Sequence, residues 1–466
     1  MTETKPVAWQ IIDNEKVFVP CRYLIQNNIV SFQFPHGYNA TYDLVIDPEL
    51  IFGSYSGSSD DNWGYTATYD LEGNLYGGGI VMGSGYPTTT GAYDVTFGGG
   101  YCDVGISKFS ADGSSLIYST FIGGSGNDLP HSLVVNSAGE LIVYGTTGST
   151  NFPTTAGAFN EDFSGGTSIT VTYVVNFTGV DIFVAKLSAD GTTLNASTFV
   201  GGSSNDGFNT ALSTHYNYGD HARGEIIVDA DDNIYVASST YSSDFPVTAG
   251  AYQATYGGTQ DAVVFKMNSN LSSLLWCTYL GGSAADGGYS LKLLSDGNVV
   301  VTGGTASSNF PVTGGVWSGT YGGNVDGFVS ILNSSGTELI ASTFAGTSQY
   351  DQSYFVETDV SDHIYITGQT RGSWTVSDDV YYNTNGSQFI TKFEGDLSAI
   401  IYSTRFGSGT TAVNISPSAF LVDVCENVYV SGWGGSVNNS FNIATGNTSG
   451  MPVTADALDA TSTGSD

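Results

Sequence analysis

The chain has 466 residues, and its 11 Lys and Arg against 44 Asp and Glu give a formal net charge of -33 at pH 7. Charged residues make up only 12% of the chain, so no basic surface is available to bind the phosphates of a nucleic acid. A hydrophobic content of 40%, with 29 Tyr and 25 Phe, predicts a folded core rather than a disordered acidic chain.

The first 48 residues form a segment of their own. Short apolar runs at 17–20, 23–25, 30–34 and 42–48 indicate a small β-hairpin segment, which we expect to end a preceding β domain. The chain starts without a cationic stretch followed by an apolar one, and nowhere do about 18 apolar residues run together. The sequence therefore predicts no signal peptide and no membrane span. Residues 49–466 are expected to form a second, repetitive domain.

One phrase recurs along residues 49–466. A Ser-Thr-aromatic-x-Gly-Gly sequence followed by Asp is clearest at 119–128 and 197–206 and has a close copy at 277–286. Weaker copies of this phrase occur elsewhere, and two further phrases, one headed by Asp and one built on Phe-Pro-Thr, recur in the same order along the chain. The aromatic position recurs every 61 to 80 residues, at Tyr55, Phe121, Phe199, Tyr279, Phe344 and, as an exception, Arg405. Several phrases in one fixed order indicate a repeat protein with six visible units.

Each unit is expected to contain four short strands. An Asp-headed apolar strand such as 181–187 turns at Asp190-Gly191, a dipeptide that favours tight hairpins. The Ser-Thr phrase supplies the second strand, and two more follow, for example at 289–294 and 299–302. The first and fourth strands are apolar on both faces, so each face must meet another layer. We therefore predict an all-β fold, a β-propeller of four-stranded blades, with a linear β-solenoid as the second choice.

The two ends of the repeat region fall at different strands of the unit. The chain enters the pattern at a second strand, Leu50 to Tyr55, and Asp466 stands where Asp181 and Asp261 begin first strands. Exposed sheet edges are normally paired or protected. We therefore expect an unclosed ring that is a piece of a longer protein.

These phrases resemble the units of the bacterial SBBP family of β-propeller repeats, which look like D-x-F-V-x-K-L, Y-S-T-Y-L-G-G-S, V-Y-V-T-G-x-T and F-P-T-x-x-G-A. The resemblance covers about residues 49–466, with two departures. Ser373-Trp374-Thr375 replaces Phe-Pro-Thr, and Arg405 replaces an aromatic residue. The resemblance implies a secreted or cell-surface location, further domains on the same polypeptide, and a large protein of the kind associated with gliding motility and type IX secretion.

The aspartates that close the Ser-Thr phrase are candidate calcium ligands, because calcium prefers clustered oxygen ligands. The alternative is that each carboxylate caps backbone amides in its own glycine-rich turn, and the repetition of one residue per unit favours this interpretation. No other metal or cofactor is expected. The candidates are Asp60, Asp128, Asp206, Asp286 and Asp351.

A second calcium hypothesis concerns residues 229–233, which begin like a calcium loop with the pattern D-x-D-x-N. Ile234 stands where the sharp turn needs glycine, and Thr240 where a bidentate Glu is required. We therefore favour an acidic turn that leads into a strand.

An insertion lengthens the unit that follows Asp206, and it contains His215, Asp220 and His221. A metal or ligand site there is one interpretation. An exposed loop is favoured, because no spacing typical of metal ligands is visible.

No enzyme motif stands out in the sequence. There is no nucleophile elbow and no H-E-x-x-H helix, and the five histidines occupy unrelated repeat positions. We expect no catalytic residue. Loop aromatic and polar side chains could instead contact sugars or partner proteins, although for each tryptophan packing between blades is the favoured interpretation. The exposed-aromatic candidates are Trp63, Trp317, Trp374 and Trp433.

Two functions follow as hypotheses. The first is a non-enzymatic, extracellular structural or adhesive module that presents loops to surface glycans or proteins. The alternative is a carbohydrate-active propeller enzyme, a hydrolase or a lyase. An enzyme should gather two or more carboxylates within about 5 to 10 Å of each other in a pocket, whereas a scaffold should spread its turn aspartates evenly.

Overall fold

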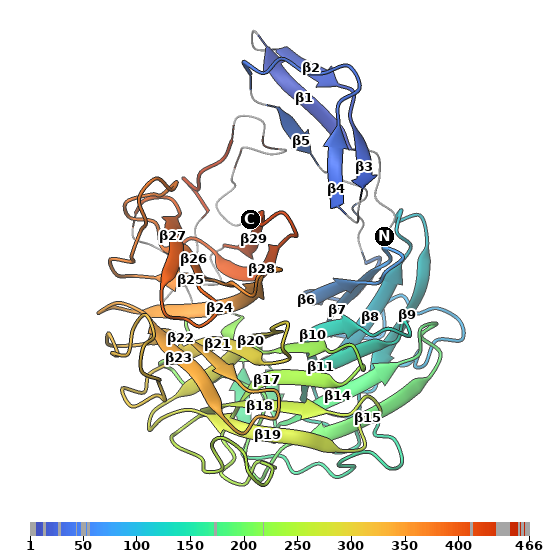
Figure 1. Ribbon diagram of the computed structural model, residues 1–466. Helices are drawn as coiled ribbons and strands as arrows, with labels where there is room; N and C mark the ends of the chain where they lie inside the picture. The colour runs from blue at the N-terminus through green and yellow to red at the C-terminus, as the bar shows by residue number, and fades with distance from the viewer. Residues whose placement is uncertain are drawn as a thin grey trace.

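The computed structural model describes residues 6–12, 15–26, 29–42, 44–47, 53, 56–171, 175–217, 219–410, 413–434, 448–454, 457 and 461. Within them the protein is almost entirely β structure, with one short 3₁₀ helix, η1 (Asp220–Ala222). Antiparallel sheets stand around a common centre (Figure 1). This confirms the predicted all-β propeller. The sixth sheet of the described residues has two strands rather than four, so the described ring is unclosed.

The N-terminal segment builds two small sheets that stand apart from the ring (Figure 1). The expected hairpin runs correspond to four of its strands, and the first strand is an addition that the sequence pattern did not indicate. Its small core contains Ala8, Val19 and Cys21. The strands are β1 (Val7–Ile12), β2 (Glu15–Val19), β3 (Arg22–Gln26), β4 (Ile29–Gln33) and β5 (Val45–Asp47), paired in the orders β2-β1-β5 and β3-β4.

Six sheets follow, and in each the strands run in chain order from the centre outward (Figure 1). Sheet one contains β6 (Asn62–Tyr69), β7 (Leu75–Val81), β8 (Asp103–Phe109) and β9 (Leu116–Ile122). Sheet two contains β10 (Asp128–Val135), β11 (Leu141–Thr147), β14 (Asp181–Leu187) and β15 (Leu194–Val200). A separate hairpin, β12 (Ile169–Val171) with β13 (Val175–Phe177), interrupts sheet two.

The remaining sheets follow the same plan. Sheet three contains β16 (Glu225–Val228), β17 (Ile234–Thr240), β18 (Asp261–Met267) and β19 (Leu274–Leu280). Sheet four contains β20 (Asp286–Leu293), β21 (Val299–Thr305), β22 (Asp326–Leu332) and β23 (Leu339–Ala345). Sheet five contains β24 (Asp351–Thr358), β25 (Ile364–Thr370), β26 (Gln388–Phe393) and β27 (Ile400–Phe406). Sheet six contains β28 (Ser416–Val422) and β29 (Val428–Trp433).

Each complete sheet combines strands from two successive sequence units. Its inner two strands are the third and fourth of one unit, and its outer two are the first and second of the next, as in β10-β11-β14-β15. The offset joins neighbouring units through backbone hydrogen bonds. The second strand expected at Leu50 to Tyr55 lies, apart from Gly53, outside the described residues, and so do residues 462–466.

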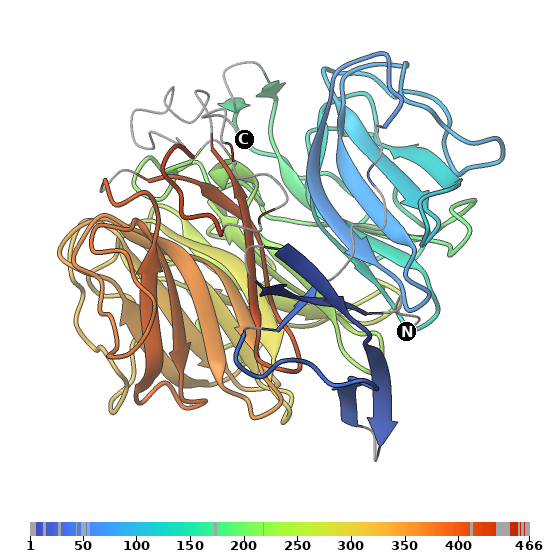
Figure 2. The ribbon, with the colours of Figure 1, turned by 90° about the horizontal axis from the view of Figure 1, so that it is seen from above.

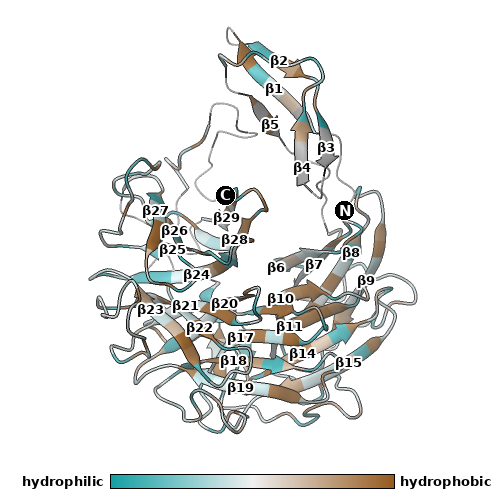
Figure 3. Cartoon of the chain, in the orientation of Figure 1, coloured by the Kyte–Doolittle hydropathy of each residue, from teal (hydrophilic) through white to brown (hydrophobic). Residues whose placement is uncertain are grey.

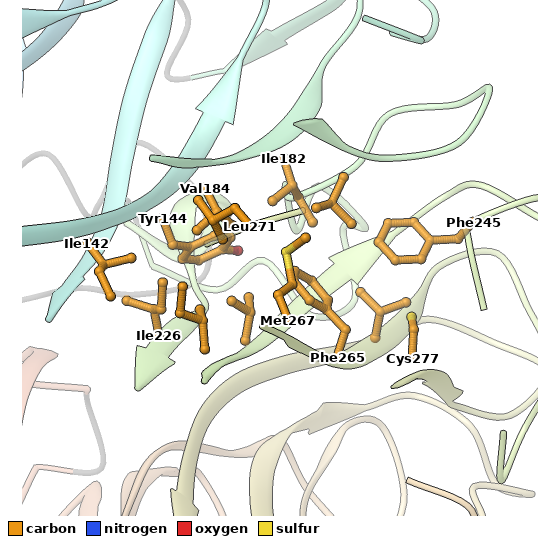
Figure 4. Close-up of a cluster of buried hydrophobic side chains, with 14 of the residues drawn as sticks. Ile142, Tyr144, Ile182, Val184, Ile226, Phe245, Phe265, Met267, Leu271 and Cys277 are labelled. Carbon is orange, nitrogen blue, oxygen red and sulfur yellow. The ribbon is translucent and has the colours of Figure 1, made fainter. Parts of the chain in front are cut away.

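The strands are apolar on both faces because each sheet packs between two others. In β14, Ile182 and Val184 belong to the cluster shared with sheet three, whereas Phe183 belongs to the cluster shared with sheet one. Figure 4 shows the first of these clusters, with Phe265 and Met267 of β18 facing Ile182 and Val184. Hydrophobic stretches recur along the strands of successive sheets (Figure 3). Burial is worth about 1.5 to 3 kcal/mol for each large side chain, so the sheets stabilise one another.

The departure at Ser373-Trp374-Thr375 preserves the packing of the Phe-Pro-Thr phrase. In the regular units the aromatic ring of this phrase packs on the strand that follows it. The ring centroid of Phe310, for example, lies 4.4 Å from that of Phe328 in β22. Trp374 stacks on Phe389 at 3.7 Å and donates its indole N–H to Ser403 at 3.0 Å. Trp374 was a candidate for an exposed aromatic contact, and that interpretation is wrong, because its exposed fraction is 4%.

Candidate functional site

Residues 207–224, here called the axial insert, separate the turn after β15 from strand β16. The sequence favoured an exposed loop for this segment, and that interpretation is wrong. Most of its described residues are buried or half-buried, although Leu212 and Ser213 are exposed. Five polar side chains have an exposed fraction of 0%, namely Asn209, Thr214, Asn217, Asp220 and His221. The reason is that the segment turns inward and meets the inner strands of the other sheets.

β-Bulges in the inner strands direct side chains toward the axial insert. Each bulge interrupts the pairing between an inner strand and its neighbour, and bulges commonly redirect a side chain in this way. The bulged residues in sheets one, two, four and five are Tyr65, His131, Tyr289 and Tyr354. Their contacts are Tyr65 with His221 at 6.4 Å and His131 with Phe208 at 5.8 Å between ring centroids, Asn209 Nδ2 to Tyr289 Oη at 3.1 Å, and Tyr354 Oη to Asp220 Oδ2 at 3.1 Å.

Asp220 and Arg223 form the centre of this network. Asp220 Oδ2 accepts the backbone N–H of Tyr216 at 2.8 Å and that of Asn217 at 2.6 Å. Arg223 Nη2 lies 3.0 Å from Asp220 Oδ1, and its guanidinium stacks 4.4 Å above the ring of Tyr354. Arg223 Nη1 also donates to the carbonyl of Pro417 in β28 at 2.9 Å, which ties sheet six to the insert.

Several other polar groups of the axial insert are paired as well. Gln369 and Asn217 exchange two hydrogen bonds of 2.9 and 3.1 Å, and Gln352 donates to the carbonyl of Thr214 at 3.0 Å. Burial raises the pKa of Tyr354 well above its usual value and lowers that of His131 to about 3. The axis is therefore filled by neutral or mutually paired groups, and Asp220 has its lone pairs engaged by donors instead of being available as a general base.

A second cluster of charged groups lies further along the inner strands. Lys292 of β20 places its ammonium 3.0 Å from Glu225 of β16 and 3.4 Å from Glu357 of β24. These two carboxylate oxygens are therefore no more than ~6.4 Å apart. Burial raises the pKa of Glu357 to about 7, although Lys292 opposes the shift. Sequence reasoning missed this acid–lysine cluster, because only the ring brings together strands that are distant in the chain.

A hollow of about 350 Å³, here called the rim hollow, opens beside the inserted β12–β13 hairpin. Phe177 is buried at its base, while Tyr101, with an exposed fraction of 43%, stands at its edge. Asn127 Nδ2 donates to the carbonyl of Asn176 at 2.5 Å and so fixes the hairpin to the loop between β9 and β10. Among the described residues no charged side chain lines the hollow, and the lining is Gly100, Tyr101, Gly126, Asn127, Gly148, Asn176, Phe177 and Thr178.

Another hollow, of about 330 Å³, lies among the turns of sheets four and five. Its lining includes the carboxylates of Asp296 and Asp396. Each of them accepts the backbone N–H two residues later, from Asn298 and Ser398, both at 2.9 Å. These carboxylates therefore cap their own turns.

The candidate calcium ligands are engaged by protein donors. Asp128 accepts the N–H of Gly124 at 2.8 Å and the hydroxyl of Ser149 at 2.9 Å, as the capping interpretation predicts, and Asp206, Asp286 and Asp351 are placed in the same way. Asp60 is exposed and accepts the N–H of Gly85 at 2.6 Å. In the described part of the chain no three His, Cys, Asp or Glu side chains gather as a metal site. Calcium binding stays a prediction.

The acidic turn predicted at residues 229–233 is confirmed. Asp229 accepts the N–H of Asn233 at 2.8 Å and pairs with Lys266 at 3.0 Å. Burial raises the pKa of Asp229, but the bonds from Asn233 and Lys266 outweigh it and hold that pKa below its usual value. The same arrangement recurs at Asp70 with Lys108 and at Asp359 with Lys392.

The remaining tryptophan candidates are half-buried. Trp63 packs against the cluster that contains Ile80 and Phe208, and Trp317 lies 5.7 Å from Phe393. Trp433 ends β29 and is also half-buried. Packing between sheets therefore describes Trp63 and Trp317 better than an exposed binding surface does.

Comparisons with known proteins find one domain family at the N-terminal segment and distant solved structures. A family described as a domain of unknown function (DUF7948) matches residues 1–49, and no curated protein matches. A protein of unknown function from Dyadobacter fermentans DSM 18053 has 11% identity and a TM-score of 0.40 over 85% of this chain and 94% of its own. The NanB sialidase of Streptococcus pneumoniae has 10% identity and a TM-score of 0.42 over 82% of this chain and 66% of its own.

A polysaccharide lyase described as a PL25 ulvan lyase bound to -[GlcA(1-4)Rha3S]- has 10% identity and a TM-score of 0.40, over 81% of this chain and 83% of its own. These resemblances, with identities of 10 to 11% and TM-scores of 0.40 to 0.42, extend no further than the arrangement of the strands. Separately, none of the described segments is a helix with the length and apolar character needed to cross a membrane.

Proposed function

We propose that this chain is a non-enzymatic, extracellular β-propeller module of a large surface protein, with a structural or adhesive role and a rim that binds neutral glycans. The observation that carries the proposal is the contrast between the axis and the rim. The axis is filled by an insert whose carboxylate, Asp220, is enclosed and fully paired. The rim hollow is open and uncharged.

The chemistry of the rim hollow suits a neutral sugar. Tyr101 offers an exposed ring on which the apolar face of a pyranose can stack, and Asn176 and Thr178 are exposed polar side chains on the facing hairpin. A volume of about 350 Å³ is at the lower end of the range for small-ligand sites. With a net charge of -33 on the chain and no cation in the hollow, anionic ligands are disfavoured.

Glycan-array binding followed by titration tests this proposal. Tyr101→Ala should weaken binding of a neutral glycan by about tenfold, which corresponds to about 1.4 kcal/mol. Thr259→Ala is the matched control, because Thr259 also stands two residues before a strand-heading aspartate, that of β18, and does not line the hollow. Equal affinity of the Tyr101→Ala variant and the wild type would reject the rim hollow as the site.

The extracellular location rests on the resemblance to the secreted SBBP repeats. The low lysine and arginine content and the acidic surface support it, since such surfaces suit a soluble secreted domain. Fractionation of cells that express the full-length natural protein tests it, with recovery in the cytoplasm as the contrary result.

A carbohydrate-active enzyme is the second candidate, and the acid–lysine cluster favours it. Glu357, with a pKa of about 7, is suited to give up a proton, and Glu225 lies within reach on the other side of Lys292. Solved structures of propeller architecture include a sialidase and a polysaccharide lyase. Release of reducing ends or of unsaturated sugars from the bound glycans, abolished by Glu357→Gln, would establish this candidate and reject the non-enzymatic proposal.

A further inference from the structure

Two sets of repeated aspartates meet wherever one complete sheet packs on the next. One set heads the third strand of a sheet, and the other stands at or just before the inner strand of the following sheet. All eight side chains have an exposed fraction of 0%. The pairs are Asp103 with Asp128, Asp181 with Asp206, Asp261 with Asp286, and Asp326 with Asp351.

A glycine lets the two carboxyl groups of a pair face the same space. A β-carbon placed on Gly123 would lie 2.7 Å from Asp103 Oδ1 and 2.9 Å from Asp128 Oδ2. The same construction at Gly201 and Gly281 gives 2.6 to 2.9 Å to both members of the second and third pairs. Any larger residue would separate the two groups, so the glycine of the Ser-Thr phrase has a role in bringing them together.

In three of the four pairs at least one carboxylate oxygen has no donor among the described residues, whereas in the pair of Asp181 and Asp206 every oxygen accepts a hydrogen bond. In the first pair, Asp128 receives bonds from Gly124 and Ser149, and Asp103 Oδ2 receives the N–H of Gly98 at 2.5 Å. Among the described residues Asp103 Oδ1 has no partner, and neither do Asp261 Oδ1 and Asp326 Oδ1. A buried oxygen beside a second carboxyl group is satisfied most simply when a proton lies between them.

The junction between sheets five and six shows that the two aspartates are lost together. The strand register places Ser387 where the other sheets have the first aspartate, since Thr370 bonds to Ser387 as Thr147 pairs with Asp181. The position of the bulge in β28 places the buried Ile415 where the second aspartate stands in β10. Joint replacement is expected if neither carboxyl group is tolerable without the other.

We propose that each of the four aspartate pairs holds one shared proton, so that the pairs act as proton-dependent clasps between successive sheets and weaken as pH rises. Two carboxyl groups that face the same buried space cannot both be ionised at low cost. The retained proton gives one carboxyl group a donor and leaves each pair with a single negative charge.

The groups around the pairs agree with this assignment. Burial raises the pKa of Asp103 to about 7 and that of Asp206 to about 8, and each partner carboxylate adds to the shift. The other titratable and charged groups that face the pairs are Asp94 and Cys102 at the first, Tyr256 and Tyr279 at the second and third, Tyr321 at the third and fourth, and Arg405 at the fourth.

A bound calcium ion is the competing explanation. Calcium needs six to eight oxygen ligands. In the first pair, Asp128 is already occupied by a backbone N–H and two hydroxyl groups, from Gly124, Ser149 and Thr147. No group of three or more acidic, histidine or cysteine ligands gathers at the pairs within the described ranges. The proton is therefore the simpler occupant.

The pH dependence of unfolding tests the proposal. The folded pKa values of about 6 to 8 lie above the ordinary value of 3.8, so the folded state holds protons that the unfolded state releases. Stability should be highest near pH 4 and should fall as pH rises to about 8. Calorimetry in buffers of different ionisation enthalpy should detect about one proton released per pair on unfolding at pH 6.

Asp103→Asn separates this effect from general charge repulsion, because an amide resembles the protonated acid and can donate to Asp128. We expect the variant to release about one proton fewer and to melt higher than the wild type at pH 8. Asp112→Asn removes the same charge from an exposed turn of the same sheet. The pKa of Asp112 is about 2, below the range of pH 4 to 8 in which the pairs titrate, so this variant should release as many protons on unfolding as the wild type.

Two results would overturn the proposal. One is an unchanged proton count in Asp103→Asn. The other is a wild-type melting temperature that falls on addition of a chelator and is restored by calcium, which would assign the pairs to a cation. If Asp103→Asn does not fold, the wild-type calorimetry decides alone, because the absence of proton release at pH 6 contradicts shared protons.

Discussion

The second strand of sheet four and that of sheet six occupy the same place in the repeat, yet their surroundings differ. Every residue of β21 is buried, whereas every residue of β29 is half-buried or exposed. The register pairs Val301 with Leu291 and Val430 with Phe420, so the two valines are equivalent positions. Val301 is fully buried and Val430 is half-buried. The core of this protein is therefore made between sheets rather than within them.

The axial insert is the clearest exception to nearest-neighbour packing, and its disruption should give the largest effect. Asp220→Ala leaves Arg223 enclosed without its counter-charge and removes the acceptor for two backbone N–H groups. We expect a loss of about 3 to 5 kcal/mol in the free energy of unfolding measured with urea. Asp112→Ala is the control at an exposed turn, and it should change stability far less than Asp220→Ala does. Similar values for the two variants would mean that the insert does not hold the sheets together.

The comparison of sheets four and six predicts an intermediate effect. Val301→Ala opens a cavity between sheets and should cost about 2 kcal/mol, whereas Val430→Ala should cost less than about 0.5 kcal/mol in the same chain. Urea denaturation of both variants measures the difference. Equal losses would show that sheet six is packed as fully as sheet four.

The smallest expected effect concerns the acidic turns, where aspartates behave oppositely to the junction pairs. Asp229→Asn should cost about 1 kcal/mol at pH 7, because it weakens a partly buried ion pair with Lys266. The folded pKa of Asp229 lies below 3.8, so its contribution is present above about pH 4 and is lost as pH falls through the folded pKa. Urea titrations at pH 7 and pH 3 should therefore show the difference shrinking. A constant difference would assign the cost to altered turn geometry.

Much of the fold could be predicted from the sequence because a repeat states its pattern several times. The strand positions, the hairpin turns at Asp-Gly and the two-sided burial all follow from short-range pattern and composition. The replacement of Phe by Trp374 was visible as a departure, but its stacking on Phe389 required the strand that it covers.

The sites could be predicted only in part, because they depend on contacts between residues far apart in the chain. The insert looked like a loop, since its polar residues find their partners in other sheets, as Asn217 does with Gln369. The acid–lysine cluster joins β16, β20 and β24, and no residue spacing in the sequence indicates it. The turn aspartates were recognised singly, but their partners in the preceding sheet became apparent only from the packing.

The most direct test of the filled axis is hydrogen exchange of the peptide that covers residues 209–224. The N–H groups of Tyr216 and Asn217 donate to the buried Asp220, and that of Asn209 donates to His221 within the insert (Figure 2 shows the ring from above). We predict slow exchange, comparable to that of strands β20 and β21. Exchange as fast as that of the exposed turn at residues 378–385 would show that the insert leaves the axis open, and would contradict the account.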